Sequence, residues 1–134
     1  MSGIVVDSNV LLDVITEDPV WFHWSSEMLA RKAETSQLVI NPVIFAEVSV
    51  RYSRIEDLDT VLPRDIVSRE PLPYKAAFLA GKIFSRHRKR EGGRRVPLPD
   101  LFIGAHAAVM NYALLTRNAG DYRKDFPSLE IIAP

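Results

Sequence analysis

The sequence predicts an α/β fold in which a short parallel sheet is covered on both faces by helices. Short, continuously apolar runs alternate along the chain with longer segments that have helical spacing. The apolar runs lack the polar–apolar alternation of a sheet with one face in water, so we expect both faces to be buried. The chain has 134 residues, no internal repeat and no long linker, which predicts one domain over residues 1–134.

The elements of the first half follow from apolar runs and from two helix-start signals. Residues 3–6 are apolar and run into Asp7-Ser8-Asn9, which predicts a buried strand followed by a turn. Each start signal is an N-cap residue before a proline, at Asp18-Pro19 and at Asn41-Pro42. In order, we expect a strand at 3–6, a helix at 19–34, a strand at 38–40, a helix from 42 to about 51 and a short helix at 55–62.

In the second half, glycines and prolines mark the ends of the elements. Gly92-Gly93 ends an amphipathic helix that runs into basic residues, and Asp100, after Pro99, is expected to open the next helix. Small residues in that helix permit close packing. In order, we expect a strand at 66–67, a helix from 74 to the glycine pair, a helix from 100, a strand at 112–116 and an edge strand at 129–132.

Composition excludes several classes of function. The chain has 17 Lys+Arg and 17 Asp+Glu, and this neutral balance argues against a protein that coats nucleic acid by bulk charge. It has no cysteine, which excludes a disulfide scaffold, a thiolate zinc site and a cysteine nucleophile. Its apolar runs are too short for a signal peptide or a membrane span. We therefore expect a cytoplasmic protein.

Several acids are placed where the carboxyl edge of the sheet should lie, which is where open parallel sheets usually bind ligands. Asp7 follows the first strand, and Asn118 and Asp121 follow the strand at 112–116. Glu47 and Asp100 are each the only charged residue in an otherwise apolar helical stretch. Any one of them alone could be a turn former, a helix cap or a surface residue. Their coincidence at one edge favours a shared site.

Such a group of carboxylates predicts a metal ion. Clustered carboxylates repel one another, and a hard divalent cation relieves that repulsion. Oxygen-only ligands suit Mg²⁺ or Mn²⁺ rather than zinc. An ion held in this way lowers the pKa of a bound water and stabilises charge on a phosphate in transfer. We therefore expect metal-assisted chemistry on a phosphate group.

Four segments, in order along nearly the whole chain, carry a resemblance to a known family. They are Val5-Val6-Asp7-Ser8-Asn9-Val10-Leu11-Leu12, Asn41-Pro42-Val43-Ile44-Phe45-Ala46-Glu47, Pro99-Asp100-Leu101-Phe102-Ile103-Gly104-Ala105-His106-Ala107, and Leu115-Thr116-Arg117-Asn118 continuing to Phe126-Pro127. Together they resemble the PIN domain, and specifically the VapC-type toxins of bacterial and archaeal toxin–antitoxin pairs. The resemblance implies a metal-dependent ribonuclease whose catalytic acids match Asp7, Glu47 and Asp100, with Asp7 and Asp100 as ligands of Mg²⁺ or Mn²⁺.

A fourth position and two hydroxyl positions of that family are also implied. Many members have an acid where this chain has Asn118, and Asp121 is the natural substitute in the same loop. Asn118 could still act through its amide. Ser8 and Thr116 match hydroxyl positions that help to hold metal or water, and their alternative role is hydrogen bonding within turns.

A basic segment precedes Asp100 and is either a solvated face or a rim that binds phosphates. Its candidate RNA-binding residues are Arg86, Arg88, Lys89, Arg90, Arg94 and Arg95. His87 is read as part of that exposed run, His23 as a surface residue and His106 as a histidine packed in its helix. No histidine pair has the spacing of a metal site.

The resemblance further implies an RNA substrate, a VapB-like antitoxin that occludes the acids, and a homodimer. The helices near Trp21 and Val43 are candidate surfaces for these partners. No motif reads DNA, so operator binding would belong to the antitoxin. Two alternatives stay open. A phosphatase with Asp7 as nucleophile would need a second acid where Asn9 stands, and a catalytically weak or inactive PIN-fold binding domain is favoured by Asn118 alone.

Overall fold

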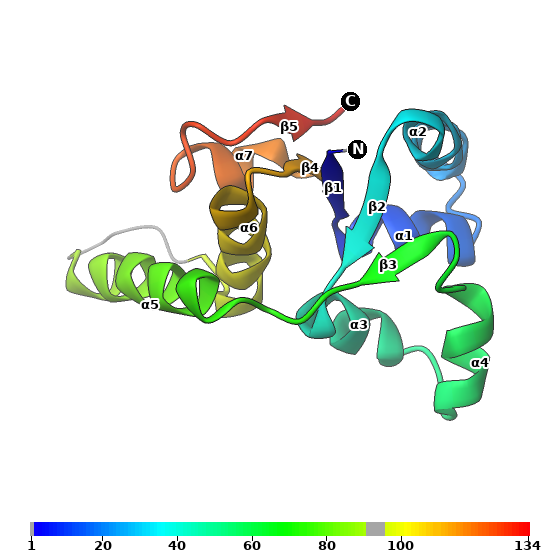
Figure 1. Ribbon diagram of the computed structural model, residues 1–134, viewed down its shortest axis with the longest axis horizontal. Coiled ribbons are helices and arrows are strands. Elements are labelled where there is room, and N and C mark those ends of the chain that lie inside the picture. Colours follow the sequence, from blue (N-terminus) through cyan, green and yellow to red (C-terminus); the bar gives the residue numbers. More distant parts are fainter. Residues whose placement is uncertain (1, 91–95) are drawn as a thin grey trace.

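Residues 2–90 and 96–134 are described by the computed structural model shown in Figure 1. Within them, five strands form one sheet in the order β3-β2-β1-β4-β5, and every neighbouring pair is parallel. The strands are β1 (Gly3–Val6), β2 (Gln37–Ile40), β3 (Val67–Arg69), β4 (Ala113–Leu115) and β5 (Ile131–Ile132). The predicted α/β class with a parallel sheet is confirmed.

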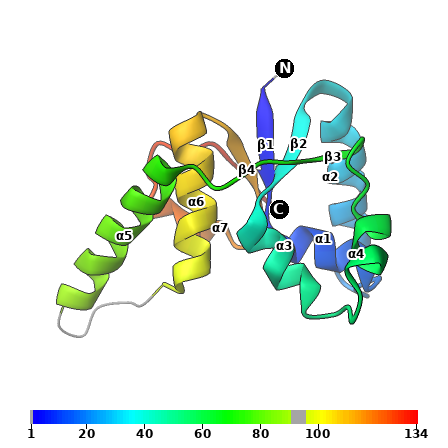
Figure 2. The same cartoon turned by 60° about the horizontal axis from the view of Figure 1, so that its bottom comes forward.

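Helices cover both faces of this sheet. They are α1 (Ser8–Ile15), α2 (Phe22–Thr35), α3 (Pro42–Ser49), α4 (Ile55–Val61), α5 (Tyr74–Lys89), α6 (Leu98–Met110) and α7 (Ala119–Arg123). Figure 2 shows α5 and α6 on one side of β1, and α1 and α2 on the other. In the described part of the chain, no helix combines the length and apolar character needed to cross a bilayer.

The core lies between the central strands and these helices. Val5 and Val6 of β1 and Leu114 and Leu115 of β4 have no exposed surface. A strand with continuous apolar sequence is stable only when both of its faces are covered, which explains why the sequence runs do not alternate. Gly104 of α6 lies so close to the Phe126 ring that a Cβ at this position would collide with it. The small residue therefore lets the C-terminal segment pack on α6.

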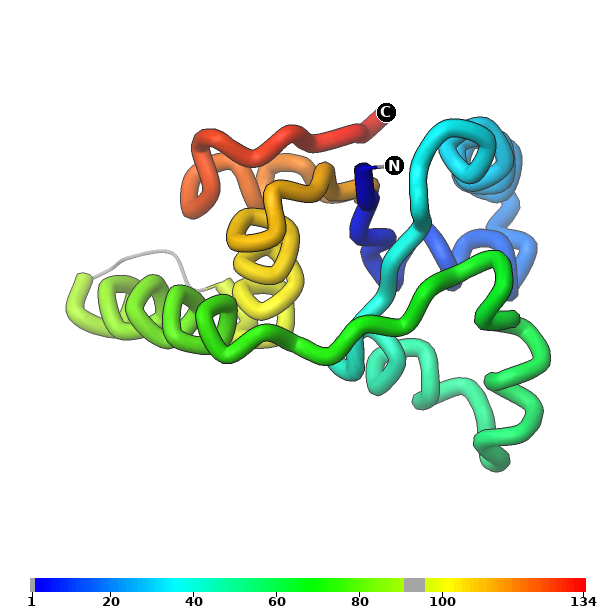
Figure 3. Tube along the Cα trace, viewed as in Figure 1, coloured from blue at the N-terminus to red at the C-terminus, as the bar shows by residue number. Residues whose placement is uncertain are grey.

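The chain order places a switch point beside β1. The chain forms β1, β2 and β3 in one direction across the sheet, and then crosses through α5 and α6 to β4 on the other side of β1. Figure 3 shows that long crossing between β3 and α5. Ligands of open parallel sheets bind at the carboxyl ends of the strands at such a point. Asp7 and Thr116, which follow β1 and β4 directly, occupy this position.

Two helices absent from the expected elements flank that point. The residues after Asp7 form α1 rather than only a turn, because Val10 and Leu11 are buried against the core and Asp7 caps the helix by accepting from the Ser8 N–H. Helix α7 was also not predicted. It has only five residues, too few for a periodic apolar pattern to be visible in the sequence.

Two predicted helix starts are wrong by a few residues. Helix α6 begins at Leu98, so Asp100 lies within its first turn rather than at its N-cap. Helix α2 begins at Phe22 rather than at 19, because Asp18 Oδ1 accepts from the N–H groups of Val20 and Trp21 and so closes a separate turn. The predicted break at Gly92-Gly93 lies outside the described residues.

Candidate active site

Asp7 is a buried carboxylate whose two oxygens accept hydrogen bonds from uncharged donors. Its side chain lies at the end of β1 and is 4% exposed. Oδ1 accepts from the Ser8 N–H at 2.8 Å. Oδ2 accepts from Thr116 Oγ1 at 2.8 Å, from the Tyr122 hydroxyl at 2.8 Å and from Asn9 Nδ2 at 3.3 Å. Burial raises the pKa of Asp7 above its ordinary value, although these hydrogen bonds oppose the rise.

Ser8 connects Asp7 to the second predicted acid. Its N–H donates to Asp7, and its hydroxyl donates to Glu47 Oε1 at 2.9 Å. Glu47 lies on α3 and is half-buried. Burial raises the pKa of Glu47, and the negative charge of Asp7 raises it further. The two carboxylates are therefore close enough to repel each other, as the sequence analysis requires of a shared site.

Tyr122 brings the third acid into the same neighbourhood. Its ring is 1% exposed on α7 and its hydroxyl donates to Asp7. The pKa of this hydroxyl lies far above the ordinary value, first because it is buried, and then because the charges of Asp7, Asp100 and Glu47 all oppose its ionisation. The three acids come from the end of β1, from α3 and from α6, and the negative charge of each acts on the same phenol. We call Asp7, Glu47 and Asp100 the acid site.

The ligand chemistry of the acid site fits a hard divalent cation. All of its potential ligands are carboxylate oxygens, which Mg²⁺ and Mn²⁺ prefer. Across residues 2–90 and 96–134, no three acidic or histidine side chains lie close enough to form a ready-made metal cage. Asp7 and Glu47, joined by Ser8, provide the pair that could hold an ion first.

The two candidates for the fourth position lie on the loop after β4 and on α7. Asn118 is exposed, and its N–H donates to Thr116 Oγ1 at 3.0 Å. Asp121 is half-buried in the first turn of α7. Which of them serves the acid site stays a prediction.

Two residues of the site were not found by the sequence analysis. Asn9 holds the two strand ends together: its amide nitrogen lies 3.3 Å from both Asp7 Oδ2 and Thr116 Oγ1, and its oxygen accepts from the Arg117 N–H at 3.2 Å. Because position 9 carries an amide, the protein lacks the general acid that a phosphatase would need there. Tyr122 could have been suspected, because it is four residues before the apolar Phe126, and a buried tyrosine needs an acceptor for its hydroxyl.

The basic segment divides into an exposed end of α5 and residues outside the described part. The exposed side chains are Arg86, Arg88, Lys89 and Arg90. They lie near the end of α5 that projects outward in Figure 1. Arg94 and Arg95 lie outside the described residues.

The three histidines have different surroundings. His87 is not part of the exposed run: it is half-buried, with Nε2 2.9 Å from Asp125 Oδ1, because this face of α5 is turned toward the C-terminal segment. The packed position expected for His106 is confirmed, since it has no exposed surface. His23 is on the surface, as predicted.

A family model of the PIN domain matches residues 4–127. The chain belongs to the PIN-domain family. This confirms the family that the four sequence motifs predicted. PIN domains are generally nucleases and typically depend on divalent metals. No curated protein sequence matches this chain significantly.

Solved structures with the same fold come from toxin–antitoxin complexes. One is VapBC2 from Rickettsia felis bound to a DNA fragment from their promoter, with a TM-score of 0.75, 19% identity and 98% of each chain covered. Another is VapBC-1 from nontypeable Haemophilus influenzae, with a TM-score of 0.74, 18% identity, and 98% of this PIN chain and 97% of that chain covered. DNA-bound VapBC from Salmonella typhimurium gives a TM-score of 0.70 at 17% identity, covering 99% and 98%.

Proposed function

We propose that this PIN domain is a metal-dependent ribonuclease and the toxin of a toxin–antitoxin pair. One observation carries the proposal. Asp7 is a buried carboxylate at the switch point of a parallel sheet, and none of the ion pairs among the described residues neutralises it. A buried carboxylate without a cationic partner costs roughly several kcal/mol of stability. A protein therefore keeps such a group where function requires it. Glu47 and Asp100 add two more negative charges to the same neighbourhood.

The roles of the chain's own residues follow from their positions. Asp7, Glu47 and Asp100 would hold the ion through carboxylate oxygens, and Asp121 or Asn118 would complete the set. When bound, Mg²⁺ or Mn²⁺ supplies positive charge that activates a water and stabilises the phosphate in transfer.

Neutral donors around the acid site keep its oxygens in place. Thr116 and Tyr122 fix Asp7 Oδ2, and Ser8 fixes one oxygen each of Asp7 and Glu47. Because the hydroxyl of Tyr122 strongly resists ionisation, it stays a hydrogen-bond donor throughout the physiological pH range. These groups orient the ligands of the ion and take no proton from the substrate.

We propose that the exposed cations of α5 bind the RNA backbone. Arg86, Arg88 and Lys89 lie on the helix that precedes the Asp100 helix in the chain, and Arg90 is its C-cap. In the sequence, Arg94 and Arg95 continue the run toward Asp100. Phosphate contacts of this kind add affinity without reading sequence. Changing Arg88, Lys89 and Arg90 to Ala should therefore weaken RNA binding and reduce its salt dependence by about one unit of slope per lost contact.

The fold similarity to chains of VapBC complexes supports a protein antitoxin as the partner of this chain. We propose that this partner covers the acid site and that the toxin forms a homodimer. A non-catalytic PIN-fold binding domain is the second candidate, since Asn118 stands where many members have an acid.

Cleavage of a structured RNA with and without divalent ions tests the nuclease proposal. We expect cleavage in Mg²⁺ or Mn²⁺, loss of cleavage in excess EDTA, and no requirement for zinc. Glu47→Gln should abolish cleavage, because an amide neutralises none of the ion's charge. Glu56→Gln, an exposed glutamate of α4, is the matched control and should retain full activity. Undiminished cleavage in EDTA would overturn the metal dependence, and a wild type that binds RNA without cutting any would favour the binding domain.

A further inference from the structure

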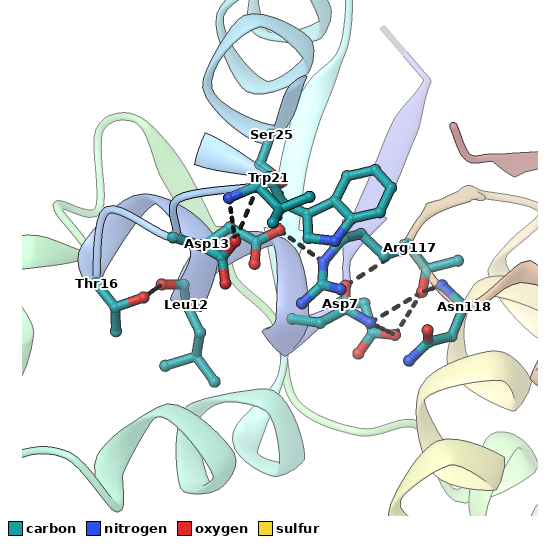
Figure 4. Close-up of polar contacts among 12 residues, drawn as sticks. Asp7, Leu12, Asp13, Thr16, Trp21, Ser25, Arg117 and Asn118 are labelled. Atoms are coloured by element: carbon teal, nitrogen blue, oxygen red, sulfur yellow. Dashed lines mark hydrogen bonds and ion pairs between the residues drawn. The ribbon is translucent and has the colours of Figure 1, made fainter. Parts of the chain in front are cut away.

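A second buried aspartate lies at the other end of α1. Asp13 is 2% exposed, and its Oδ2 accepts from Arg117 Nε at 2.7 Å and from Ser25 Oγ at 2.6 Å. Unlike Asp7, this carboxylate has a cation as its partner. Figure 4 shows the Arg117 side chain reaching from the loop after β4 to Asp13. The ion pair therefore connects α1 to a loop more than a hundred residues away in the sequence.

Arg117 is held on three sides. Its guanidinium carbon lies 5.3 Å from the centre of the Trp21 ring, while its Nε reaches Asp13. Its backbone N–H donates to Asn9 Oδ1 at 3.2 Å. An arginine suits this place better than a lysine, because the planar guanidinium can stack on an aromatic ring and pair with a carboxylate at the same time.

One peptide bond separates Arg117 from Thr116, which contacts Asp7 of the acid site. Thr116 precedes Arg117 and donates to Asp7 Oδ2 at 2.8 Å, and Thr116 Oγ1 also accepts from the Asn118 N–H at 3.0 Å. Asn9 contacts Asp7, Thr116 and Arg117 together. If the Arg117 side chain were released, the start of the loop would lose its anchor and the donors of Asp7 would no longer be held in one geometry.

We propose that Arg117 is a positioning residue: its ion pair with Asp13 fixes the start of the loop after β4, so that Thr116 and Asn9 hold Asp7 in the orientation needed for metal-assisted RNA cleavage. The proposal rests on the proposed nuclease function. Within the described part of the chain, the Arg117 side chain pairs with Asp13 and lies over the Trp21 ring, and it forms no ion pair with Asp7 or Glu47. Mutation of residues that orient the ligands of a metal ion typically costs about 10–100-fold in metal affinity or activity.

The test compares Arg117→Met with Arg123→Met, an exposed arginine of α7 that serves as the matched control. In Arg117→Met, we expect kcat for RNA to fall about tenfold or more at unchanged KM, and the Mn²⁺ affinity measured by calorimetry without RNA to fall similarly. Arg117→Lys, which keeps the charge, should recover part of both losses. Arg123→Met should match the wild type in both.

Hydrogen exchange provides a readout that does not depend on nuclease activity. The amides of residues 117 and 118 donate to Asn9 Oδ1 and Thr116 Oγ1, so both should exchange at least about tenfold faster in metal-free Arg117→Met while the strand amides remain protected. If Arg117→Met does not fold, Trp21→Leu, which leaves the ion pair in place, should show the same local loss in milder form. Unchanged exchange, kcat and Mn²⁺ affinity in a folded variant would overturn the proposal. A wild type that cleaves no RNA would instead overturn the proposed function.

Discussion

Helix α6 carries two polar side chains into two different networks. Asp100, in its first turn, belongs to the acid site, whereas His106, two turns later, has no exposed surface and belongs to a second network. His106 Nδ1 lies 2.9 Å from Asn41 Nδ2, and its Nε2 lies 3.3 Å from Glu70 Oε1. Glu70 Oε2 accepts from the Tyr112 hydroxyl at 2.9 Å. Each polar group of this second network has a partner.

The geometry around His106 determines its protonation. Asn41 Oδ1 accepts from the Ile44 N–H at the start of α3, so the amide nitrogen of Asn41 must be the atom that faces His106. His106 Nδ1 is then an acceptor and Nε2–H the donor to Glu70, which makes the ring neutral. Burial lowers the pKa of His106, although Glu70 opposes this effect, and the neutral form is favoured.

The two networks differ in their balance of charge, and this difference indicates different roles. The His106 network balances its donors, acceptors and charge, and we expect it to stabilise the contact between α3 and α6. The acid site instead brings three carboxylates near one phenol, and Asp7 and Glu47 accept hydrogen bonds from uncharged donors. Repulsion between these carboxylates costs stability and provides a place for a cation. Four predictions follow from this difference, beginning with the largest expected effect.

Asp100→Asn should reduce RNA cleavage by about 100-fold or more, since a ligand of the ion is lost. The metal-free protein should be as stable as the wild type or more stable, because the change removes one of three like charges. Asp57→Asn, which also lies in the first turn of a helix, is the control. Both variants are compared by cleavage rate and by metal-free melting temperature. A cleavage rate within a few-fold of wild type would remove Asp100 from the acid site.

His106→Leu should lower stability and leave cleavage almost unchanged, which is the opposite of what we expect for Asp100→Asn. It leaves the buried Asn41 amide without its acceptor and Glu70 Oε1 without its donor, so we expect the free energy of unfolding to fall by about 2–4 kcal/mol. Cleavage per folded molecule should stay within a few-fold of wild type. Urea unfolding measures the first quantity and initial rates measure the second. Since His23 is exposed, His23→Leu should change neither, and a large loss of kcat in His106→Leu would place this network in catalysis.

The pH dependence of stability should identify His106 as a neutral buried ring. Because its folded pKa lies below the unfolded value of 6.5, unfolding takes up a proton when the pH falls below that value. The stability due to neutral His106 is fully present above pH 6.5 and is lost as the pH falls toward the folded pKa. The difference in melting temperature between wild type and His106→Leu should therefore shrink between pH 7 and pH 5. A constant difference would mean that folding leaves the pKa of His106 unchanged, and a difference that grows as the pH falls would mean that the ring is charged in the native state.

The smallest expected effects are those of removing the hydroxyl groups of two tyrosines. Tyr112→Phe and Tyr122→Phe each remove one hydroxyl that donates to a carboxylate, and each should lower the free energy of unfolding by about 1.5–3 kcal/mol. Only Tyr122→Phe should also lower kcat, because its hydroxyl orients Asp7 while that of Tyr112 orients Glu70. Equal kcat values for the two variants would show that Tyr122 has no role in positioning Asp7.

Local patterns in the sequence were sufficient to predict most of the fold. Continuous apolar runs predicted the buried parallel strands, and Asn41-Pro42 predicted the start of α3, where the Asn41 side chain does cap the helix. The short helices α1 and α7 were missed because one or two turns give too little periodicity. Glu47 and Asp100 could be singled out because each is the only charged residue in an apolar stretch, and Asp7 because it directly follows the first strand.

The sequence by itself determined the fold class, the family and the acids that were singled out. Only the tertiary structure decided that Tyr122 and Asn9 hold Asp7, that His106 is neutral, and that Arg117 pairs with Asp13 rather than with the acid site. Strand and helix patterns are local, since they depend on which faces of a few neighbouring residues are apolar. The partner of a buried polar group depends on how segments 100 residues apart pack together, and no local pattern contains that information.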